Sequence, residues 1–530
     1  MCTLSWQIWQ GKLSLAFSRD EALDRAIAEP PRIEQTANGK IVCPVDPEGG
    51  GTWLSLNEQG LVLCLLNDYR YKPSVARRSR GLLVKDLANS HSLEDLAVTL
   101  KQLNLTDYAP FQLVVFPGPE APRLWQWNGS DLAEVVAPGS PLSSSSLFPA
   151  LTPWLRRRWF RRQTGGNLRQ LTAEQHRQLH LNSGPLGRYL GIRMRRSQRA
   201  TVSLCHLELT AHEGKLHYQD LLNEKQSTTR LDIQSRSIRQ GDQPVQRDRP
   251  LDLEALFQSK NPALHQSLPK LTWPLLRWVL CEAKLNRGLS QLDGQHARDF
   301  CAHVLDHLDV SIRIAANSAP LPDASKRPVF LANHPSGGID GLVLITWLSQ
   351  HFPELRVIVS DALLALPHLE PFVVPVDRYQ RNHGALRQLH KAFASDAALL
   401  IFPAGRTARR QQGRLVDAPW QKMPINLARQ YERSLVTLHL DTANSWKFDA
   451  LAAVRRRLSI GLNLEMLLLV REILKPARRT VGLRLGPYQT ATEWVPKGQT
   501  DQARLAYWRG QYDQLAGPVE PALSSTEVFS

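Results

Sequence analysis

Short apolar runs alternate with stretches of helical periodicity between residues 328 and 440, and this alternation constrains the fold more than any other feature. A short apolar run suits a buried strand, and a periodic stretch after it suits a helix that covers a sheet. The pattern predicts an α/β layer fold with a mainly parallel sheet. We expect strands at 328–332, 356–359, 398–402 and 435–440, and helices at 264–289, 295–308, 341–350, 383–395 and 424–431.

The N-terminal part of the chain has a different texture, which predicts a separate α+β domain. Strand-like apolar runs are separated by Gly and Asp-Pro turns, and one helical stretch interrupts them. The expected strands are at 3–17, 51–66, 111–116, 123–127, 201–210 and 215–218, and the expected helix is at 92–103.

A chain of 530 residues is longer than one hydrophobic core usually organises, so we expect two domains. Residues 226–250 are polar, charged and contain proline, which is typical of a linker. The expected division is a first domain at 1–225, a linker at 226–250, a second domain at 251–495 and a tail at 496–530.

The net charge limits the partners that the chain is expected to bind. Lys and Arg number 65 against 49 Asp and Glu, a formal charge of +16, which favours nucleic acid or the anionic face of a membrane. No zinc-finger, RNP or helix-turn-helix pattern occurs, so nucleic acid is not expected. The sequence lacks a run of about 20 apolar residues and a signal-peptide pattern. We therefore expect a cytoplasmic protein that lies peripherally on the inner face of the cell membrane.

The cysteines and several histidines do not have the spacing of a metal site, and no metal is predicted. The cysteines lack CxxC pairs and are expected to be reduced thiols, with Cys43, Cys64 and Cys205 in the core. His206, His212 and His217 recur through a strand region without a carboxylate, so we expect them at the surface or in the core. The six cysteines are Cys2, Cys43, Cys64, Cys205, Cys281 and Cys301.

The segment VFLANHPSGGIDG at 329–341 is the most informative one for function. An apolar strand runs into His334, and Asp340 stands at the head of an apolar helix. This order places His334 at the carboxyl edge of the sheet, where open α/β sheets bind ligands. Asp340 can fix one ring nitrogen, which leaves the other free to accept a proton from a hydroxyl. The motif is equally compatible with a His–Asp pair that only caps a helix. We expect Asn333, Gly337 and Gly338 to bind substrate beside the pair.

Two arginine-containing segments follow further strands, at 371–378 and 401–410. Guanidinium groups suit the phosphate or carboxylate of an acceptor or an acyl donor. Taken alone, each segment is also explained by a solvated basic loop. The residues expected to bind substrate here are Arg378, Pro403, Gly405, Arg406 and Arg409.

Together these segments resemble the PlsC-like glycerolipid acyltransferases, and most closely the branch often labelled putative hemolysin, which includes lyso-ornithine-lipid acyltransferases. The resemblance covers 250–490 and implies that His334 is the general base and Asp340 its orienter, while Arg378 and the 403–406 turn bind the anionic group of the acceptor. Five residues separate His334 from Asp340 where the common motif has four, and Arg406 replaces a usually acidic residue. The blocks are NHPSGGIDG (333–341), VPVDR (374–378), IFPAG (401–405), GRLVDAPW (413–420), LHLDTANSWKF (438–448) and the lead-in at 282–300.

Cys2 follows the initiator methionine and begins a strand-like run. If Met1 is removed, a free α-amine lies beside the thiol, as an N-terminal nucleophile hydrolase requires. The context resembles the NRDE-motif family, which includes the transport and Golgi organisation proteins, with Ser18 in place of the usual Asn. The matching segments are FSRDE (17–21), GGTWLSLNEQGLVLCLLND (50–68) and GPLGRYLGIRMRRSQRATVSL (184–204).

This second resemblance implies an αββα sandwich of the Ntn-hydrolase type. By it, Cys2 is the nucleophile, Arg19 and Asp20 position its amine and thiol, and Asn67 helps to bind an oxyanion. It leaves open whether the domain is a hydrolase or a non-catalytic module that binds lipid or a haem-related ligand.

The sequence as a whole predicts an acyltransferase that moves a fatty acyl group from acyl-CoA or acyl-acyl carrier protein to a lysolipid hydroxyl, without a cofactor. The alternatives are an amidohydrolase that uses Cys2, and a lipid-binding N-terminal domain that delivers substrate. The basic, aromatic segment PWLRRRWFRR at 153–162 suits a lipid interface or base stacking. Apolar helices at 268–281 and 462–473 suit either lipid docking or the core.

Overall fold

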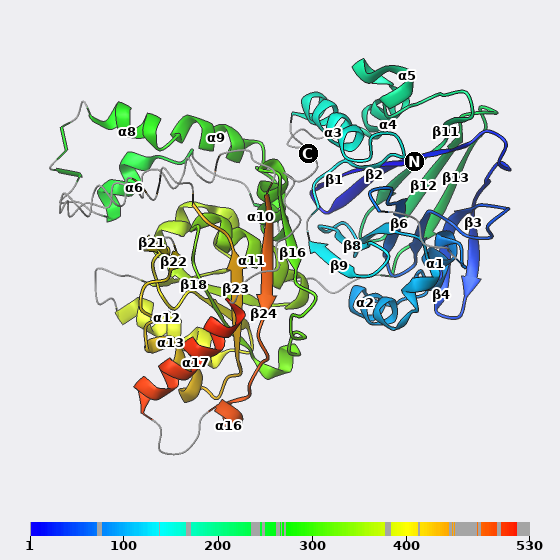
Figure 1. The fold of residues 1–530 in the computed structure, drawn as a ribbon. Coiled ribbons are helices and arrows are strands. Elements are labelled where there is room, and N and C mark those ends of the chain that lie inside the picture. Colours follow the sequence, from blue (N-terminus) through cyan, green and yellow to red (C-terminus); the bar gives the residue numbers. More distant parts are fainter. Residues whose placement is uncertain are drawn as a thin grey trace. The chain divides into compact units, whose positions relative to one another are not determined.

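The computed structural model describes residues 2–516 except 72–76, 137, 166–170, 235–243, 246–249, 261–264, 267, 270–271, 377–382, 412–413, 445–447, 449, 451–473, 475–478 and 495–499. The chain divides into two compact units (Figure 1). Unit 1 comprises Met1–Asp248, Arg287–Ala316 and Pro476–Thr480, and unit 2 comprises Arg249–Asn286, Asn317–Lys475 and Val481–Ser530.

Two antiparallel sheets form the centre of unit 1. The first has the order β10 (Leu142–Ser144), β1 (Cys2–Trp9), β2 (Lys12–Ala22), β11 (Arg199–Leu209), β12 (Glu213–Asp220) and β13 (Gln226–Asp232). The second has the order β16 (Val310–Ile314), β9 (Leu132–Val136), β8 (Arg123–Trp127), β7 (Phe111–Phe116), β6 (Val62–Asn67), β5 (Leu54–Asn57), β4 (Gly39–Val45) and β3 (Glu29–Thr36).

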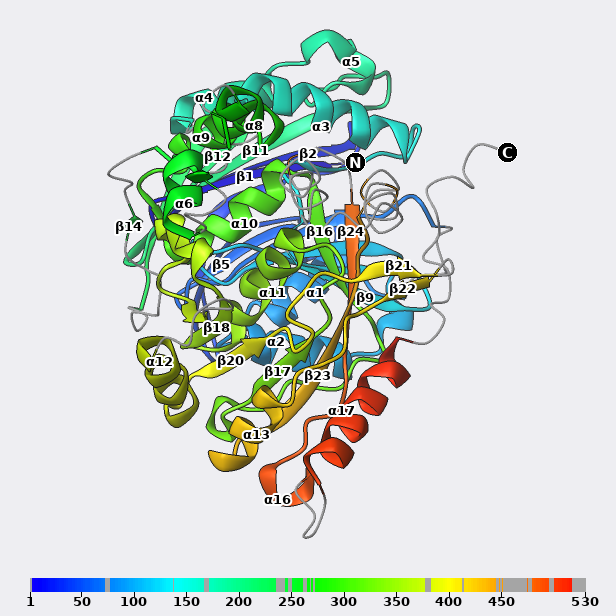
Figure 2. The ribbon, with the colours of Figure 1, turned by 90° about the vertical axis from the view of Figure 1, so that its left-hand side faces the viewer.

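The two sheets pack face to face through the side chains that alternate along each strand. Leu4 and Phe17 of the first sheet join Val62 and Phe116 of the second in one fully buried cluster. Helices α1 (Arg80–Leu87) and α2 (Leu93–Gln102) bury leucines against the outer face of the second sheet. Helices α3 (Leu151–Thr164) and α4 (Ala173–Leu181) cover the outer face of the first sheet (Figure 2). The predicted αββα sandwich is therefore confirmed.

Unit 1 also contains further elements. They are η1 (Leu105–Asp107), η2 (Gly184–Leu186), α5 (Gly187–Leu190), α10 (Ala297–His307) and the antiparallel pair β14 (Pro244–Val245) and β15 (Gln295–His296).

Unit 2 contains a mainly parallel sheet, as the alternating pattern predicted. Its order is β19 (Val373–Val376), β18 (Leu355–Ser360), β20 (Ala398–Ile401), β17 (Val329–Ala332), β23 (Leu435–Asp441) and β24 (Arg479–Leu485), and only β24 runs antiparallel to its neighbour β23 among these described strands. One face packs against α12 (His383–Ala394), α13 (Met423–Gln430), α16 (Ala491–Trp494) and α17 (Asp501–Leu515). Phe330 points to the other face and meets Phe352 at the end of α11 (Gly338–His351).

The remaining described elements of unit 2 are short. They are α6 (Leu253–Lys260), α8 (Trp273–Val279), α9 (Glu282–Ser290), η4 (Ala324–Lys326), η5 (Asp361–Ala365), η6 (Pro367–Leu369) and the hairpin of β21 (Arg409–Gln411) and β22 (Arg414–Val416).

Several predicted boundaries are wrong. The linker prediction at 226–250 begins too early, because Gln226–Asp232 pairs with β12 as the last strand of the first sheet. The predicted start of the second domain at 251 lies close to Arg249, where unit 2 begins, but the structure assigns residues 287–316 to unit 1. The predicted tail at 496–530 contains α17, whose Trp508 and Tyr512 are buried in the core of unit 2. The predicted apolar helix at 462–473 lies outside the described residues.

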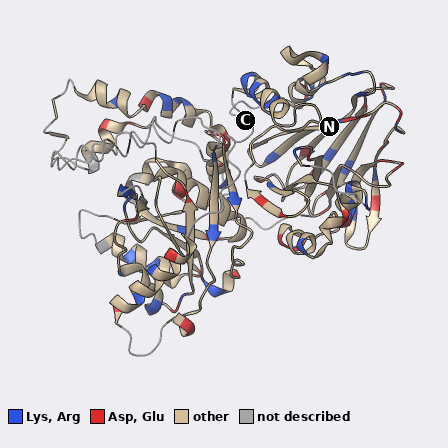
Figure 3. Cartoon of the chain, in the orientation of Figure 1, with Lys and Arg blue, Asp and Glu red and all other residues tan. Residues whose placement is uncertain are grey.

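The segment 153–162 is the middle of α3, where its arginines appear blue (Figure 3), and three of the five contact other parts of unit 1. Arg156 is fully buried, donates to the Thr3 hydroxyl at 2.8 Å and lies 3.8 Å from the Asp20 carboxylate. Arg157 and Arg161 bind backbone carbonyls and nearby carboxylates of the same unit. These contacts hold the three arginines within unit 1, and the expectation that the segment meets a lipid interface stays a prediction.

Candidate active site

His334 and Asp340 lie in the loop and first helical turn that follow β17, the strand between β20 and β23. Because these three strands are parallel, their carboxyl ends meet at one edge of the sheet, which is where such sheets bind ligands. The chain turns through Gly337, whose φ of 82° is a backbone conformation that favours glycine, and α11 begins at Gly338. The loop thus brings the imidazole and the carboxylate together, as the motif predicted.

The Asp340 carboxylate is fully buried and accepts four hydrogen bonds. Oδ2 accepts from the backbone N–H groups of Ser336 at 2.8 Å and Gly337 at 2.9 Å. Oδ1 accepts from the hydroxyls of Ser336 at 2.5 Å and Thr442 at 2.7 Å. Asp340 therefore caps the N-terminus of α11, so the helix-capping interpretation of the motif is correct as a structural statement.

The same carboxylate also faces the imidazole. His334 Nδ1 lies 3.2 Å from Asp340 Oδ2, within ion-pair distance. The ring is turned so that Nδ1 makes no hydrogen bond to any described residue, and it packs on Phe402 with ring centroids 4.2 Å apart. The His334 side chain keeps 22% of its surface exposed. Nδ1 is thus the ring nitrogen that faces the buried carboxylate.

Three hydrogen bonds join the His334 loop to the end of β23. The Asn333 amide donates to the Leu440 carbonyl at 2.9 Å and accepts from its N–H at 2.7 Å. Asn444 donates to the carbonyl of Pro335 at 3.1 Å. The side chain of Asn333, predicted to bind substrate, is thus occupied by the backbone of a neighbouring strand.

The IFPAG turn lies beside this loop, since Ala408 N–H donates to the His334 carbonyl at 2.8 Å. Pro403 is buried, whereas Gly405 and Arg406 are exposed. Arg409 donates to the carbonyls of Thr407 and Ala408 and lies over the Phe448 ring, which fixes its guanidinium. Of the predicted anion-binding arginines, Arg406 is the exposed one and Arg378 lies outside the described residues.

The second predicted site lies in unit 1, where Cys2 begins β1 and stands opposite Arg19 on β2. Cys2 is 8% exposed, and burial raises the pKa of its thiol. Its backbone N–H donates to the Ser144 hydroxyl at 3.1 Å. Arg19 stacks on Trp53 and pairs with Glu21 and Asp46, at N–O distances of 3.2 and 3.4 Å.

The other two residues predicted for this second site, Asp20 and Asn67, make side-chain hydrogen bonds to Thr201 and Tyr69. The Asp20 carboxylate accepts from the Thr201 hydroxyl at 2.6 Å and lies beside Arg156 of α3 on the outer face of the sheet, because successive strand residues point to opposite faces. Burial raises its pKa, which Arg156 partly counters. Asn67 ends β6 and donates to the Tyr69 hydroxyl at 3.1 Å. Met1 lies outside the described residues.

Both halves of the chain are similar to known proteins. Residues 255–508 match the family model described as Acyltransferase. A lyso-glycine lipid O-acyltransferase from Phocaeicola vulgatus is 30% identical over 245 residues, which are 45% of this chain and 87% of that protein. The chain belongs to this acyltransferase family. Residues 1–182 of the acyltransferase match a second model, Transport and Golgi organisation 2, so the two predicted resemblances are confirmed.

Solved structures with low overall similarity also match. The acyltransferase PlsC from Thermotoga maritima is 12% identical with a TM-score of 0.28, and the match covers 46% of this chain and 89% of that one. Penicillin V acylase from Agrobacterium tumefaciens is 12% identical with a TM-score of 0.29, and the match covers 44% of this chain and 86% of that one.

The acyltransferase has polar groups near His334 that sequence reasoning did not single out. Burial raises the pKa of Asp417, and the neighbouring Arg509 and the backbone N–H of His334 counter this rise. Tyr512 of α17 stacks on His439 with ring centroids 5.6 Å apart, and burial raises the pKa of its phenol. Asp417 lies within the GRLVDAPW block, so the sequence offers a signal for it. Tyr512 lies in the segment at 496–530, which the sequence pattern predicts as a tail.

A buried chain of serines and histidines between the first sheet and α4 was also missed. His176 and His180 both direct Nε2 at the Ser5 hydroxyl, at 2.7 Å. Their Nδ1 atoms meet the hydroxyls of Ser14 at 2.9 Å and Ser18 at 2.7 Å. Ser14 also meets Nε2 of His206 at 3.1 Å, so His206 lies in the core as one of the predicted alternatives stated.

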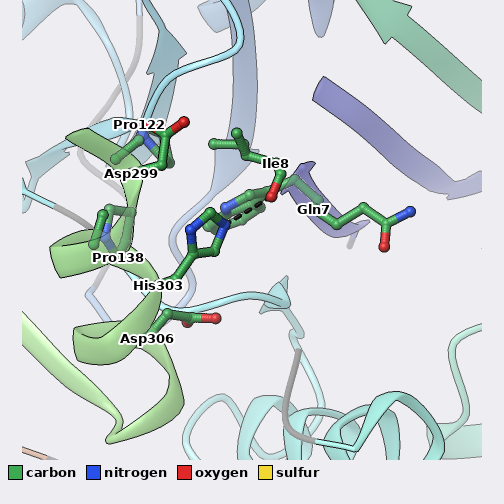
Figure 4. Close-up of a pocket in the computed structure, with 10 residues that line it drawn as sticks. Gln7, Ile8, Pro122, Pro138, Asp299, His303 and Asp306 are labelled. Carbon is green, nitrogen blue, oxygen red and sulfur yellow. Dashed lines mark hydrogen bonds between the residues drawn. The ribbon is translucent and has the colours of Figure 1, made fainter. Parts of the chain in front are cut away.

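A small hollow in unit 1 opens at the Ile8 end of β1, six residues along the strand from Cys2 (Figure 4). His303 of α10 lines it and shares a 2.7 Å hydrogen bond between Nε2 and the Ile8 carbonyl. Burial lowers the pKa of His303. Asp299, Asp306 and Pro138 complete the wall drawn in the figure. No sequence pattern indicated this hollow, because its lining comes from segments almost 300 residues apart.

No described helix combines the length and apolarity that crossing a bilayer requires. No group of three or more His, Cys, Asp or Glu side chains among the described residues is arranged to hold a metal ion.

Proposed function

We propose that this acyltransferase moves a fatty acyl group from an acyl thioester to the hydroxyl of a lysolipid, with His334 as the general base. The observation that carries the proposal is the pairing of a partly exposed imidazole with a buried carboxylate at the carboxyl edge of a parallel sheet. The lipid acceptor is supported by the relative named as a lyso-glycine lipid O-acyltransferase.

In the proposed reaction, His334 Nε2 takes the proton of the acceptor hydroxyl while Asp340 stabilises the imidazolium that forms. The hydroxyl oxygen forms a bond to the thioester carbonyl carbon, and the resulting tetrahedral oxyanion collapses by breaking the carbon–sulfur bond. The thiolate of CoA or of acyl carrier protein leaves and takes the proton from the imidazolium. Each step uses only side chains and the two substrates, so we propose no cofactor and no metal.

Arg406 is the described residue best suited to bind the anionic group of the acceptor. It is exposed at the turn beside His334, whereas Arg409 is already bonded to its own backbone. We also propose that Arg378 contributes, on the basis of the motif alone.

The test is an acyl-transfer assay with purified full-length protein, lysolipid acceptors that include lyso-glycine lipid, and either acyl-CoA or acyl-acyl carrier protein. His334→Ala is expected to lower turnover by about 10²- to 10⁴-fold, as expected for loss of a general base. His212→Ala, at an exposed turn of unit 1, is the matched control and is expected to keep full activity. Equal turnover of His334→Ala and the unmodified protein rejects the proposal.

We further propose that the protein works on the inner face of the cell membrane, held peripherally by anionic lipid. The net charge of +16 and two exposed apolar side chains of α8, Leu275 at 60% and Trp278 at 66%, support this. Sedimentation with anionic and neutral vesicles tests it. Binding is expected to need anionic lipid, to fall with salt and to weaken in Trp278→Ala. Equal sedimentation with both kinds of vesicle contradicts it.

A second candidate activity belongs to unit 1, where Cys2 acts as an N-terminal nucleophile on an acyl amide. The position of Cys2 at the start of β1, opposite Arg19 and within the Transport and Golgi organisation 2 match, favours it. Intact mass is expected to show loss of Met1, and a thiol probe is expected to label Cys2 but not Cys2→Ser. A retained Met1 or an unlabelled Cys2 rejects the hydrolase activity. The alternative is then that unit 1 binds lipid or delivers substrate without catalysis.

A further inference from the structure

The two oxygens of the Asp340 carboxylate have different surroundings. Oδ2 faces His334 and is bonded to the backbone of the turn that carries His334, through Ser336 and Gly337. Oδ1 accepts hydrogen bonds from two hydroxyls, those of Ser336 and Thr442. Three of the four donors are therefore local to the turn, and Thr442 is the donor that comes from elsewhere, 102 residues along the chain.

Thr442 is held in place by the sheet itself. It follows β23, which ends at Asp441 and pairs in parallel with β17. The Asn333–Leu440 pair of hydrogen bonds fixes the register of the two strand ends, and Asn444 fixes the Pro335 carbonyl. A hydroxyl mounted on this segment has a fixed direction, so its 2.7 Å bond limits rotation of the Asp340 carboxylate.

The bond also acts on the charge of the carboxylate. A fully buried carboxylate keeps its charge because donors surround it, and each donor withdraws part of the negative charge from the oxygens. The imidazolium of His334 is stabilised by the charge that remains on Oδ2. A donor on Oδ1 therefore moderates how strongly Asp340 holds a proton on His334.

We propose that Thr442 is a positioning residue of acyl transfer: its hydroxyl orients the Asp340 carboxylate and sets the basicity of His334. This rests on the proposed role of His334 as the general base. Thr442 acts through Asp340 and does not touch the reacting atoms.

Thr442→Val keeps the shape of the side chain and removes only the hydroxyl. Oδ1 then carries more charge and Asp340 stabilises the imidazolium more strongly, so the acid limb of the kcat/KM–pH profile is expected to move up by about half a pH unit. The carboxylate is also less firmly oriented, so kcat is expected to fall about tenfold while KM stays the same. Thr442→Ser restores the hydroxyl and is expected to restore both kcat and the profile.

Asn444→Ala is the matched control, because Asn444 holds the same loop at Pro335 without touching the carboxylate. It is expected to leave the acid limb in place. If Thr442→Val does not fold, Ser336→Ala removes the other hydroxyl on Oδ1 and is expected to move the limb in the same direction.

The experiment is a pH series of acyl-transfer kinetics from about pH 5 to 9 on the full-length variants, with thermal unfolding as a check on folding. A Thr442→Val profile that superimposes on the unmodified one overturns the proposal. So does a loss of kcat that Thr442→Ser fails to reverse, or one that Asn444→Ala reproduces without a pH shift. His334→Ala with full activity instead rejects the general-base role, and this outcome is separate from those of the Thr442 series.

Discussion

The buried serine–histidine chain of unit 1 is expected to make the unit sensitive to acid. Burial lowers the pKa of His176 and His180 to about 3 and that of His206 to about 2, from the usual 6.5. The unfolded chain therefore binds protons on these residues between pH 6.5 and about 3, while the folded chain does not. The folded state is stable above pH 6.5 and loses stability as the pH falls through this window.

The size of the stability loss at a given pH follows from the usual histidine pKa of 6.5. At pH 5, which lies about 1.5 pH units below it, each neutral histidine costs about 2 kcal/mol relative to the protonated form in the unfolded chain. Three such residues give a loss of about 6 kcal/mol, which is comparable with the whole stability of many domains. None of the three has a carboxylate as a hydrogen-bond partner among the described residues, so protonation in the folded state gains no ion pair there.

The assay is urea unfolding of the full-length protein at pH 7, 6 and 5, followed by pulse-labelling hydrogen exchange of peptides from β1, β2 and α4, which report on unit 1. His176→Gln removes one titrating group. Its free energy of unfolding is expected to change by about 2 kcal/mol less between pH 7 and 5 than that of the unmodified protein. An identical pH dependence in the two proteins refutes the reasoning, as does an unfolding midpoint that is the same at pH 5 and 7.

Three further predictions concern single side chains of unit 2. Arg433 is fully buried and donates to the carbonyls of Ala392 and Phe393 at the end of α12, so Arg433→Met is expected to lower the free energy of urea unfolding by about 3 kcal/mol; Arg433→Lys is expected to recover only part of it. Trp508→Ala opens a cavity in the core and is expected to lower the free energy of urea unfolding by about 3–5 kcal/mol. An unchanged free energy of unfolding would mean that α17 behaves as a tail. Gly337→Ala forces a side chain into a φ of 82° and is expected to cost about 1–3 kcal/mol and to lower acyl-transfer turnover; an unchanged turnover shows that the turn tolerates this strain.

The sequence predicts much of unit 2 and of its site because the information is local. Each parallel strand is a short apolar run with its helix close behind, and His334 and Asp340 lie within one turn and helix start. Strands β7 and β8 were predicted at their observed bounds for the same reason. The run at 3–17 is two strands, because Gln10 and Gly11 both have positive φ and close a tight turn that the apolar pattern alone does not mark.

The features that were missed depend on contacts between distant segments. Thr442 and Asp340 are 102 residues apart, and Ser5 and His180 are 175 residues apart, so neither pair has a signature in local periodicity. A serine on the outer face of a strand normally indicates that this face is exposed to solvent. Ser5 is instead covered by α4, whose His176 and His180 form hydrogen bonds with its hydroxyl. The helix α17 was missed because its large side chains Trp508 and Tyr512 are few among polar neighbours.

The serine–histidine chain of unit 1 couples the positions of the protons that its hydroxyls and imidazoles share. Each neutral imidazole carries one N–H, and each hydroxyl carries one proton and two lone pairs. When Ser5 and Ser14 both donate within the chain, the protons from Ser18 through His180, Ser5, His176 and Ser14 to His206 all point in the same direction, and reversing that direction requires every member to change. A serine that accepts from both of its imidazoles interrupts this order. In the ordered state, the nitrogen that carries the proton on His206 is coupled to the direction in which the Ser18 hydroxyl points. Replacing the Ser5 hydroxyl by a methyl group would remove this coupling, because Ser5 links the two imidazoles.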